Sequence, residues 1–219
     1  MRAVLIVLGI AIFGVVLSTL LSKPKDLTPF PQEREDQKRQ EANKSSDAAI
    51  KTNTNKPAEP AFSAPKEGAV QAVLSVEGRG DIVIELYPKA APKTVAHITD
   101  LIKKGFYNGI KVHRVEPGFV VQAGDPKTKT EGVDAPGIGQ GGSGQNIPFE
   151  TNDLKNVTGA LSMALSERRS DTGDSQFFIN MKHNDFLDGD YCVFGKVIQG
   201  MDNVPKIQKG DTIKSFTLK

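Results

Sequence analysis

The sequence has no tryptophan and only one cysteine, Cys192, among its 219 residues. A single cysteine excludes an internal disulfide bond. It also cannot complete a zinc site with the three histidines, because His97, His113 and His183 do not have the spacing of metal ligands. We therefore predict a fold that forms without a disulfide bond and without a metal ion.

An excess of charge of one sign is also missing from most of the chain. The formal net charge is +2, and from residue 68 to 219 the 18 Lys and Arg residues are balanced by 18 Asp and Glu residues. Binding to nucleic acid needs a basic cluster that faces the phosphates, and the sequence shows none. We predict that nucleic acid is not a partner.

Two common enzyme motifs are incomplete or absent. The segment GIGQGG, residues 137–142, has the spacing of a dinucleotide-binding loop, but no strand pattern precedes it and no helix pattern follows it. Tight turns at positive φ explain these glycines better. No G-x-S-x-G segment is present, so the sequence offers no nucleophile of the serine-hydrolase type. We predict no cofactor.

The longest apolar run lies near the start of the chain. Residues 3–21 carry no charge, and as a helix they would span roughly 28 Å, close to a bilayer core of about 30 Å. A cleaved signal peptide is the alternative, but the run is long for one and no A-x-A-like site follows it. We predict that residues 1–22 are a transmembrane anchor, or else a signal sequence. Positive charges after the run favour a cytoplasmic domain, whereas the very short N-terminal tail resembles an export signal, and we expect the non-cytoplasmic side.

Residues 23–67 mix charges of both signs with Pro, Asn, Ser and Gln, and they contain few large apolar side chains. Such a composition cannot bury enough surface to offset its chain entropy. It predicts a disordered linker between the anchor and a domain formed by residues 68–219, which has the usual size of a single domain.

The domain sequence is rich in short strand patterns. AVQAVLSVE and DIVIELY are joined by Gly78-Arg79-Gly80, which is typical of a hairpin. The apolar period then becomes helical, with Pro92 in the first turn and Gly105 at the C-cap. Six further strand-like runs follow: KVHRV, GFVVQAG, GALSMAL, SQFFINM, YCVFGKVI and TIKSFTL. Eight short strands with few helices predict a mainly β fold, a closed eight-stranded antiparallel β-barrel without exposed edges.

Several of these segments together resemble the cyclophilins, a family of peptidyl-prolyl cis–trans isomerases. They are FYNGIKVHRVEPGFVVQAGDP, GALSMA, SQFFI, FLDGDYCVFGKV and GMDNV, in the family's order from about Val70 to Lys219. The resemblance implies the family's eight-stranded barrel with two capping helices. It also implies an isomerase that assists protein folding and whose partners are proline-containing polypeptides. It says nothing about residues 1–67.

The resemblance further implies a site, position by position. Arg114 matches the family's catalytic arginine, and Gln122 matches the glutamine beside it. The positions implied to bind substrate are Phe119, Met163, Ala164, Phe178, Phe186, Leu187 and Tyr191. These residue types suit the reaction, because a twisted X–Pro amide has a lone pair on nitrogen that an always-protonated guanidinium can donate to. A chaperone or scaffold that holds proline segments, with incidental turnover, is the alternative function.

Four features differ from the best-known eukaryotic members. Phe186 stands where they often have tryptophan, Tyr191 where they commonly have histidine, and Leu165 where they commonly have asparagine. The stretch LSERRSDTGD is longer by two residues. Phe and Tyr at these positions look like bacterial members. They predict weak or no binding of cyclosporin, with isomerase activity retained.

Overall fold

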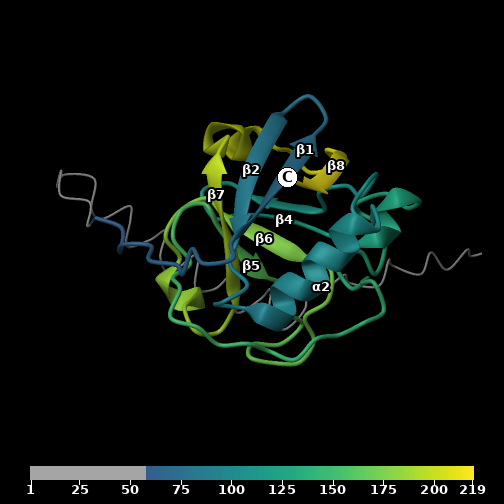
Figure 1. Cartoon of the computed structure of the whole chain (residues 1–219). Coiled ribbons are helices and arrows are strands. Elements are labelled where there is room, and N and C mark those ends of the chain that lie inside the picture. Colours follow the sequence, from purple (N-terminus) through teal and green to yellow (C-terminus); the bar gives the residue numbers. More distant parts are fainter. Residues whose placement is uncertain (1–57) are drawn as a thin grey trace, which may run out of the picture.

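The computed structural model describes residues 58–219 (Figure 1). The predicted membrane segment, residues 1–22, lies outside this range, and so does the predicted linker up to residue 57. Among the residues that are described, no helix has the length and apolar character needed to cross a bilayer.

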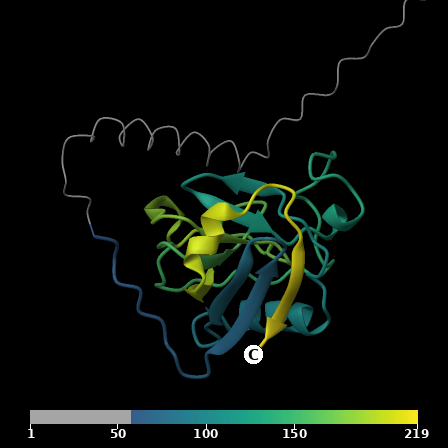
Figure 2. The same cartoon turned by 90° about the horizontal axis from the view of Figure 1, so that it is seen from above.

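Eight strands form one antiparallel sheet, as the strand patterns predict. Their order in the sheet is β3-β4-β6-β5-β7-β2-β1-β8. The bounds are β1 Val70–Val76, β2 Gly80–Leu86, β3 Arg114–Glu116, β4 Val120–Ala123, β5 Ala160–Met163, β6 Phe177–Asn180, β7 Val193–Gln199 and β8 Ile213–Leu218. The first and last strands along the chain, β1 and β8, are neighbours (Figure 2).

The sheet is a curled half-barrel, which corrects the prediction of a fully closed barrel. Its two edge strands, β3 and β8, do not share a regular ladder. The segment before β3 instead exchanges backbone hydrogen bonds with the segment before β8: Val112 donates to Asp211 and Gly210 donates to Val112, both at 2.8 Å. Residues 109–112 and 210–213 thus bridge the gap, because β3 is only three residues long and cannot pair along its whole edge.

One α-helix, α2, is present among residues 58–219, and it covers Pro92–Lys103. Its buried face contains Val95, Ile98, Leu101 and Ile102, as the apolar period predicts. The second capping helix implied by the resemblance is not found in the described residues. The three other helical segments are 3₁₀ turns: η1 Pro126–Lys129, η2 Asp185–Leu187 and η3 Met201–Lys206.

The N-terminus of α2 is capped from a distant loop. No side chain at the preceding residue caps it. The carboxylate of Glu150 instead accepts hydrogen bonds from the backbone N–H groups of Lys93 at 2.9 Å and Thr94 at 2.7 Å. A carboxylate at this end of a helix also interacts favourably with the helix dipole. The loop that follows the glycine-rich segment is therefore attached to the helix.

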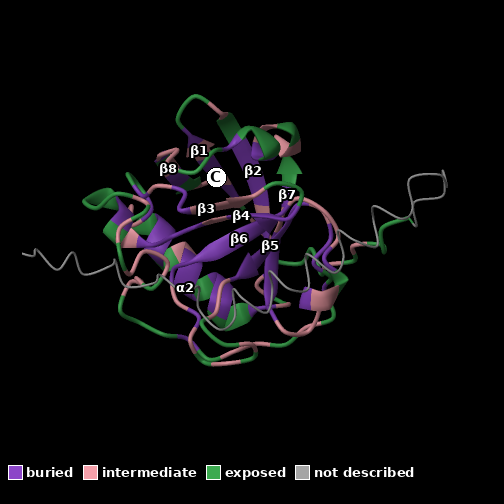
Figure 3. Cartoon of the chain, turned by 180° about the vertical axis from the view of Figure 1, so that it is seen from behind, coloured by how far each residue is buried: buried purple, intermediate pink, exposed green. Residues whose placement is uncertain are grey.

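The core lies between the concave side of the sheet and α2, where the buried residues gather (Figure 3). Its largest fully buried side chains are those of Tyr107, Phe177, Phe194 and Phe216. The Tyr107 hydroxyl donates a hydrogen bond of 2.9 Å to the backbone oxygen of Ser175. This contact fixes the residues directly before β6, and β6 carries part of the site.

The end of the predicted linker packs against the domain. The Phe62 ring lies 5.7 Å from the Tyr87 ring, and the Lys196 ammonium lies 4.4 Å from the centre of the same Phe62 ring. Glu59 accepts hydrogen bonds from the backbone and the hydroxyl of Thr158. Residues 58–67, which we call the strap, therefore follow the outer surface of the folded domain rather than extending freely into solvent (Figure 1).

A chain that begins at Pro65 lacks these strap contacts, and we expect its free energy of unfolding to fall by about 1–3 kcal/mol. The contacts lie away from the cleft described below, so kcat/KM on a short prolyl peptide should not change. Urea unfolding of this chain and of Phe62→Ala measures the effect. The matched control is Glu67→Ala, which removes only an exposed pair with Lys89. Equal stability of all the variants and the full chain would show that the strap contacts contribute nothing.

Candidate active site

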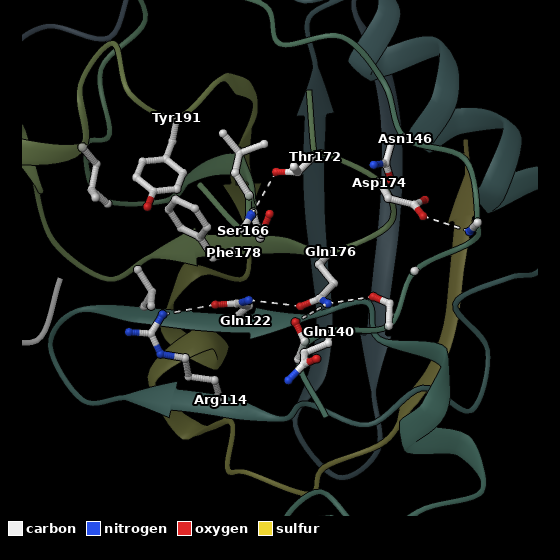
Figure 4. Close-up of a pocket in the computed structure, with 18 of the residues that line it drawn as sticks. Arg114, Gln122, Gln140, Asn146, Ser166, Thr172, Asp174, Gln176, Phe178 and Tyr191 are labelled. Carbon is white, nitrogen blue, oxygen red and sulfur yellow. Dashed lines mark hydrogen bonds between the residues drawn. The ribbon is translucent and has the colours of Figure 1, made fainter. Parts of the chain in front are cut away.

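A cleft of about 490 Å³ lies beside β3, β4 and β6 (Figure 4). One half is apolar, and the other half is formed by glycines and polar side chains. Its lining residues are Arg114, Phe119, Val120, Gln122, Gly139, Gln140, Gly141, Gly142, Gly144, Asn146, Ala164, Leu165, Ser166, Thr172, Asp174, Gln176, Phe178, Leu187 and Tyr191. Among the described residues no cluster of His, Cys, Asp and Glu is suited to hold a metal ion.

Arg114 stands at the first position of β3, directly opposite Gln122 on β4. Its Nη1 donates a hydrogen bond of 3.2 Å to Oε1 of Gln122, and its Nε lies 3.9 Å from a carboxylate oxygen of Glu116. The guanidinium carbon is 5.8 Å from the centre of the Phe119 ring. Its Nη2 is buried and has no hydrogen-bond partner among residues 58–219. A buried guanidinium N–H group is therefore left without an acceptor beside an apolar surface.

A relay of amides fixes the orientation of this arginine. Gln122 accepts from Arg114 through Oε1, and its Nε2 donates a hydrogen bond of 3.1 Å to Oε1 of Gln176. Gln176 in turn donates to the backbone oxygens of Gly139 and Gly141, each at 2.8 Å. Figure 4 shows this row of hydrogen bonds along the floor of the cleft. Because the NH₂ group of Gln176 donates to two carbonyl oxygens, its oxygen faces the NH₂ group of Gln122. The oxygen of Gln122 therefore faces Arg114.

The apolar half of the cleft is a separate cluster of side chains. Phe119, Val120, Phe178, Leu187 and Tyr191 are buried in it, and Ala164, Leu165 and Phe186 pack against it. The rings of Phe178 and Tyr191 meet edge to face at 5.6 Å, and those of Phe119 and Phe186 stack at 5.7 Å. Aromatic pairs at these distances hold each other's orientation. The cluster forms a rigid, apolar pocket next to the guanidinium of Arg114.

The structure brings most of the predicted site residues together. Seven of them line the cleft: Arg114, Phe119, Gln122, Ala164, Phe178, Leu187 and Tyr191. Phe186 does not line it, but its ring stacks on that of Phe119 at the edge of the apolar cluster. Met163 is 2% exposed and belongs to the main core, where it contributes to packing below the cleft rather than to its surface.

The polar half of the cleft was missed by sequence reasoning. Gly137 and Gly139 have φ angles of 83° and 89°, which confirms the prediction of tight turns at these two positions. The prediction is wrong for Gly142, which has no positive φ and is instead needed for a close approach, because a Cβ atom there would lie 2.2 Å from Oδ2 of Asp174. Gly141 is required for a close approach, because a Cβ atom there would lie 2.0 Å from Oδ1 of Asp125. Asp125 accepts hydrogen bonds from the backbone N–H groups of Lys127, Gly139 and Gly141. This buried carboxylate therefore holds the glycine segment in place as a wall of the cleft.

His113, directly before Arg114, titrates unusually. Burial is the main cause that lowers its pKa from 6.5 to about 4; the nearby charge of Asp125 opposes this and that of Arg114 adds to it. In the unfolded chain the imidazole takes up a proton at its ordinary pKa, so between pH 6.5 and pH 4 the unfolded chain binds more protons. The contribution of neutral His113 to the free energy of unfolding is therefore complete above pH 6.5. It is lost as the pH falls towards the pKa of about 4 in the folded chain.

We expect the free energy of unfolding to fall by about 2–3 kcal/mol between pH 7 and pH 4.5 because of His113. The carboxylates add their own dependence, so the measurement is the difference between the unmodified chain and His113→Gln, each unfolded with urea across this range. The variant should show a shallower decline with falling pH. Parallel curves would mean that His113 titrates alike in the folded and unfolded states.

The sequence model of the family described as cyclophilin type peptidyl-prolyl cis-trans isomerase matches residues 72–218. The chain belongs to the cyclophilin family. Two bacterial relatives are similar over most of their own length. Peptidyl-prolyl cis-trans isomerase B of Bacillus subtilis is 43% identical over 141 residues, which cover 64% of this chain and 91% of that protein. Peptidyl-prolyl cis-trans isomerase of Helicobacter pylori is 42% identical over 141 residues, which cover 63% of this chain and 80% of that protein.

Solved structures of a cyclophilin type peptidyl-prolyl cis-trans isomerase from Cryptosporidium parvum share this fold. One superposes with a TM-score of 0.59 at 29% identity, covering 68% of this chain and 98% of that one. A second, determined in the presence of the dipeptide Ala-Pro, superposes with a TM-score of 0.58 at 27% identity and equal coverage. This cyclophilin is a peptidyl-prolyl cis–trans isomerase.

Proposed function

We propose that Arg114 is the catalytic residue of this cyclophilin and that the apolar cluster holds the proline ring of its substrate. The observation that carries the proposal is the unpartnered Nη2 of Arg114, which is buried beside the Phe119 ring. An N–H group in such a place gains a hydrogen bond only when a substrate supplies the acceptor.

The chemistry required is rotation about one bond. The amide resists rotation by about 18–20 kcal/mol because of the double-bond character of C–N. To accelerate rotation, the enzyme must bind the twisted amide more tightly than either planar form. The twisted prolyl nitrogen regains a lone pair that accepts a hydrogen bond from Arg114, while Phe119, Phe178 and Leu187 hold the ring. Neither a proton transfer nor a covalent intermediate is needed.

Gln122 has a positioning role in this proposal. Its oxygen engages Nη1 of Arg114 at 3.2 Å and leaves Nη2 for the substrate. The proline-containing substrate class is supported by the related Cryptosporidium parvum structure, which was determined in the presence of Ala-Pro. Exchange between the cis and trans forms of an Ala-Pro peptide, followed by NMR with catalytic amounts of the protein, tests the proposal. Binding of the peptide without faster exchange would favour the alternative, a chaperone that holds proline segments.

We further propose that residues 1–22 anchor the enzyme in a membrane, with the domain on the non-cytoplasmic side, where it assists the folding of exported or membrane-proximal proteins. The apolar run of residues 3–21 supports this proposal. Protease treatment of intact cells and of spheroplasts tests it, since an exported domain is cleaved only when the outer barriers are opened. A soluble protein shortened near residue 22 would identify a cleaved signal peptide, and protection in spheroplasts would place the domain in the cytoplasm.

Cyclosporin is expected to bind weakly, and Phe186→Trp is expected to bind it roughly 2- to 10-fold more tightly. Indole offers an N–H donor that phenyl lacks, and one hydrogen bond contributes about 0.5–1.5 kcal/mol. Phe186 lies at the edge of the apolar cluster, where a larger ring can reach a ligand. Inhibition of peptide isomerisation by increasing concentrations of cyclosporin measures the inhibition constants of the unmodified chain and of Phe186→Trp. Tight inhibition of the unmodified chain, with no gain in the variant, would contradict this interpretation of Phe186.

A further inference from the structure

We propose that Asn184 is a positioning residue for the isomerase reaction, which sets the separation between two walls of the proline pocket. The inference rests on the proposed roles of Phe119 and Leu187. Asn184 is fully buried and stands directly before the η2 turn, which carries Leu187. It lies behind the pocket rather than in its lining, so it acts through its neighbours.

Asn184 is bonded to both walls. Its side-chain Nδ2 donates a hydrogen bond of 3.4 Å to the backbone oxygen of Phe119, the residue that forms the wall of the pocket next to Arg114. Its backbone oxygen accepts a hydrogen bond of 3.0 Å from the backbone N–H of Leu187, a second residue of the apolar lining. One residue thus spans the pocket from behind and links the strand that carries Phe119 to the turn that carries Leu187.

A buried amide network keeps Asn184 from moving. Its Nδ2 also donates to Oδ1 of Asn180 at 2.7 Å, and its backbone N–H donates to the backbone oxygen of Asn156 at 2.9 Å. Asn156 and Asn180 are themselves fully buried and hydrogen-bonded to each other at 3.2 Å. Asn156 also holds Asp188, the residue after Leu187, through its backbone N–H at 2.7 Å. The turn is therefore held on both sides of Leu187.

The network is not optimal for stability alone. The side-chain oxygen of Asn184 is buried and accepts no hydrogen bond from the described residues. An unpaired buried oxygen costs free energy. The N–H groups of the same amide satisfy Oδ1 of Asn180 at 2.7 Å and add a second hydrogen bond to the carbonyl of Phe119, which also accepts one of 2.7 Å from the backbone N–H of Met181. The amide thus ties the Phe119 carbonyl to the turn of Leu187, so that both side chains keep their places in the pocket.

The expected kinetic effect follows from what the walls contact. They hold the ring in the planar and in the twisted state alike, so loosening them weakens binding in both states. We expect Asn184→Ala to raise KM, and the Kd for an Ala-Pro peptide, at least fivefold, while kcat stays within twofold. Asn184→Ser keeps a short hydroxyl donor and should disturb folding less than Asn184→Ala. We expect it to give an intermediate rise of KM and Kd.

The matched control is Asn152→Ala. Asn152 also holds loops together through its amide, which donates to the backbone oxygens of Val193 at 2.9 Å and Ala90 at 3.3 Å, but it does not line the cleft. Its removal should lower the free energy of unfolding without changing KM. Kinetic constants from NMR exchange and urea unfolding are measured for all three variants, at a temperature where each is folded.

Three results would overturn the proposal: an unchanged KM in both Asn184 variants, an equal rise of KM in Asn152→Ala, or a fall of kcat with KM unchanged. This test is independent of the test of the proposed function. The catalytic role of Arg114 is tested by the kcat of Arg114→Ala, in which Asn184 is unchanged. If Arg114→Ala retains full kcat, the catalytic assignment is wrong, whereas the peptide Kd of the Asn184 variants still decides whether the pocket has lost its shape.

Discussion

Replacement of Arg114 by alanine is expected to lower kcat/KM on a prolyl tetrapeptide about 10- to 100-fold, since a hydrogen bond from a charged donor contributes about 1.5–3 kcal/mol. The loss should appear mainly in kcat, because the contact to the prolyl nitrogen is made only in the twisted state. The far-UV circular dichroism spectrum should not change, as the side chain is held by one amide and one distant carboxylate.

Two further variants make this test specific. Arg114→Lys should also be slow, because an ammonium group cannot engage Gln122 and the substrate with a planar fork. Arg79→Ala removes an arginine that is paired with Asp211 and does not line the cleft, and its activity should stay at the original level. If Arg114→Ala retains at least half of the activity, the mechanism proposed here is wrong.

Replacement of Asp125 by alanine is expected to lower the free energy of unfolding by about 3–5 kcal/mol. The carboxylate is fully buried and accepts from three backbone N–H groups, at 2.9 Å from Lys127, 2.7 Å from Gly139 and 3.0 Å from Gly141. Without it these donors are left unpaired. The relay also loses its anchor, because Gln176 is bonded to the oxygens of the same two glycines.

Urea unfolding measures this loss, and two variants frame it. Asp134→Ala removes an exposed carboxylate that contacts only Lys209 at the surface, and we expect a change within about 0.5 kcal/mol. Gly141→Ala should be destabilising like Asp125→Ala, because the added methyl group occupies the position of the Asp125 carboxylate. If Asp125→Ala is as stable as Asp134→Ala, the glycine wall does not depend on this carboxylate.

The strands and the helix could be predicted because their signal is local. Alternating apolar residues mark β1 and β2, and the helical period with Pro92 and Gly105 marks α2. The predicted second capping helix came from resemblance alone. Of the 3₁₀ turns in the described residues, η3 contains Pro205, which has no amide hydrogen to continue a helix.

The site residues were predicted from the resemblance to the cyclophilins, whose motifs are each continuous in sequence. Arg114 and Gln122 belong to one such motif, and the structure places them opposite each other in one hairpin. The contacts of Gln176 with Gly139 and Gly141 join segments far apart in the chain, and no local pattern encodes them. Met163 lies in the core for a similar reason, since strand alternation alone cannot say which face of β5 meets the cleft.

The strap shows the limit of composition as a predictor. Residues 58–67 are polar on average, yet one aromatic residue, Phe62, finds a ring and an ammonium group on the domain surface. Averages over a long segment conceal a single such contact.

The pairing of β1 with β8 has a consequence for biosynthesis. Val73 is paired with Thr217 and Leu74 with Phe216, so β1 cannot complete its pairing before β8 has been made. On the ribosome β1 emerges while β8 has not yet been made, and an unpaired strand edge is prone to associate with other chains. The bridge between residues 109–112 and 210–213 requires the same late segment. The sheet of this folding catalyst is thus completed only after residues 210–218 have been made, and until then the β1 edge of the nascent chain has no β8 partner.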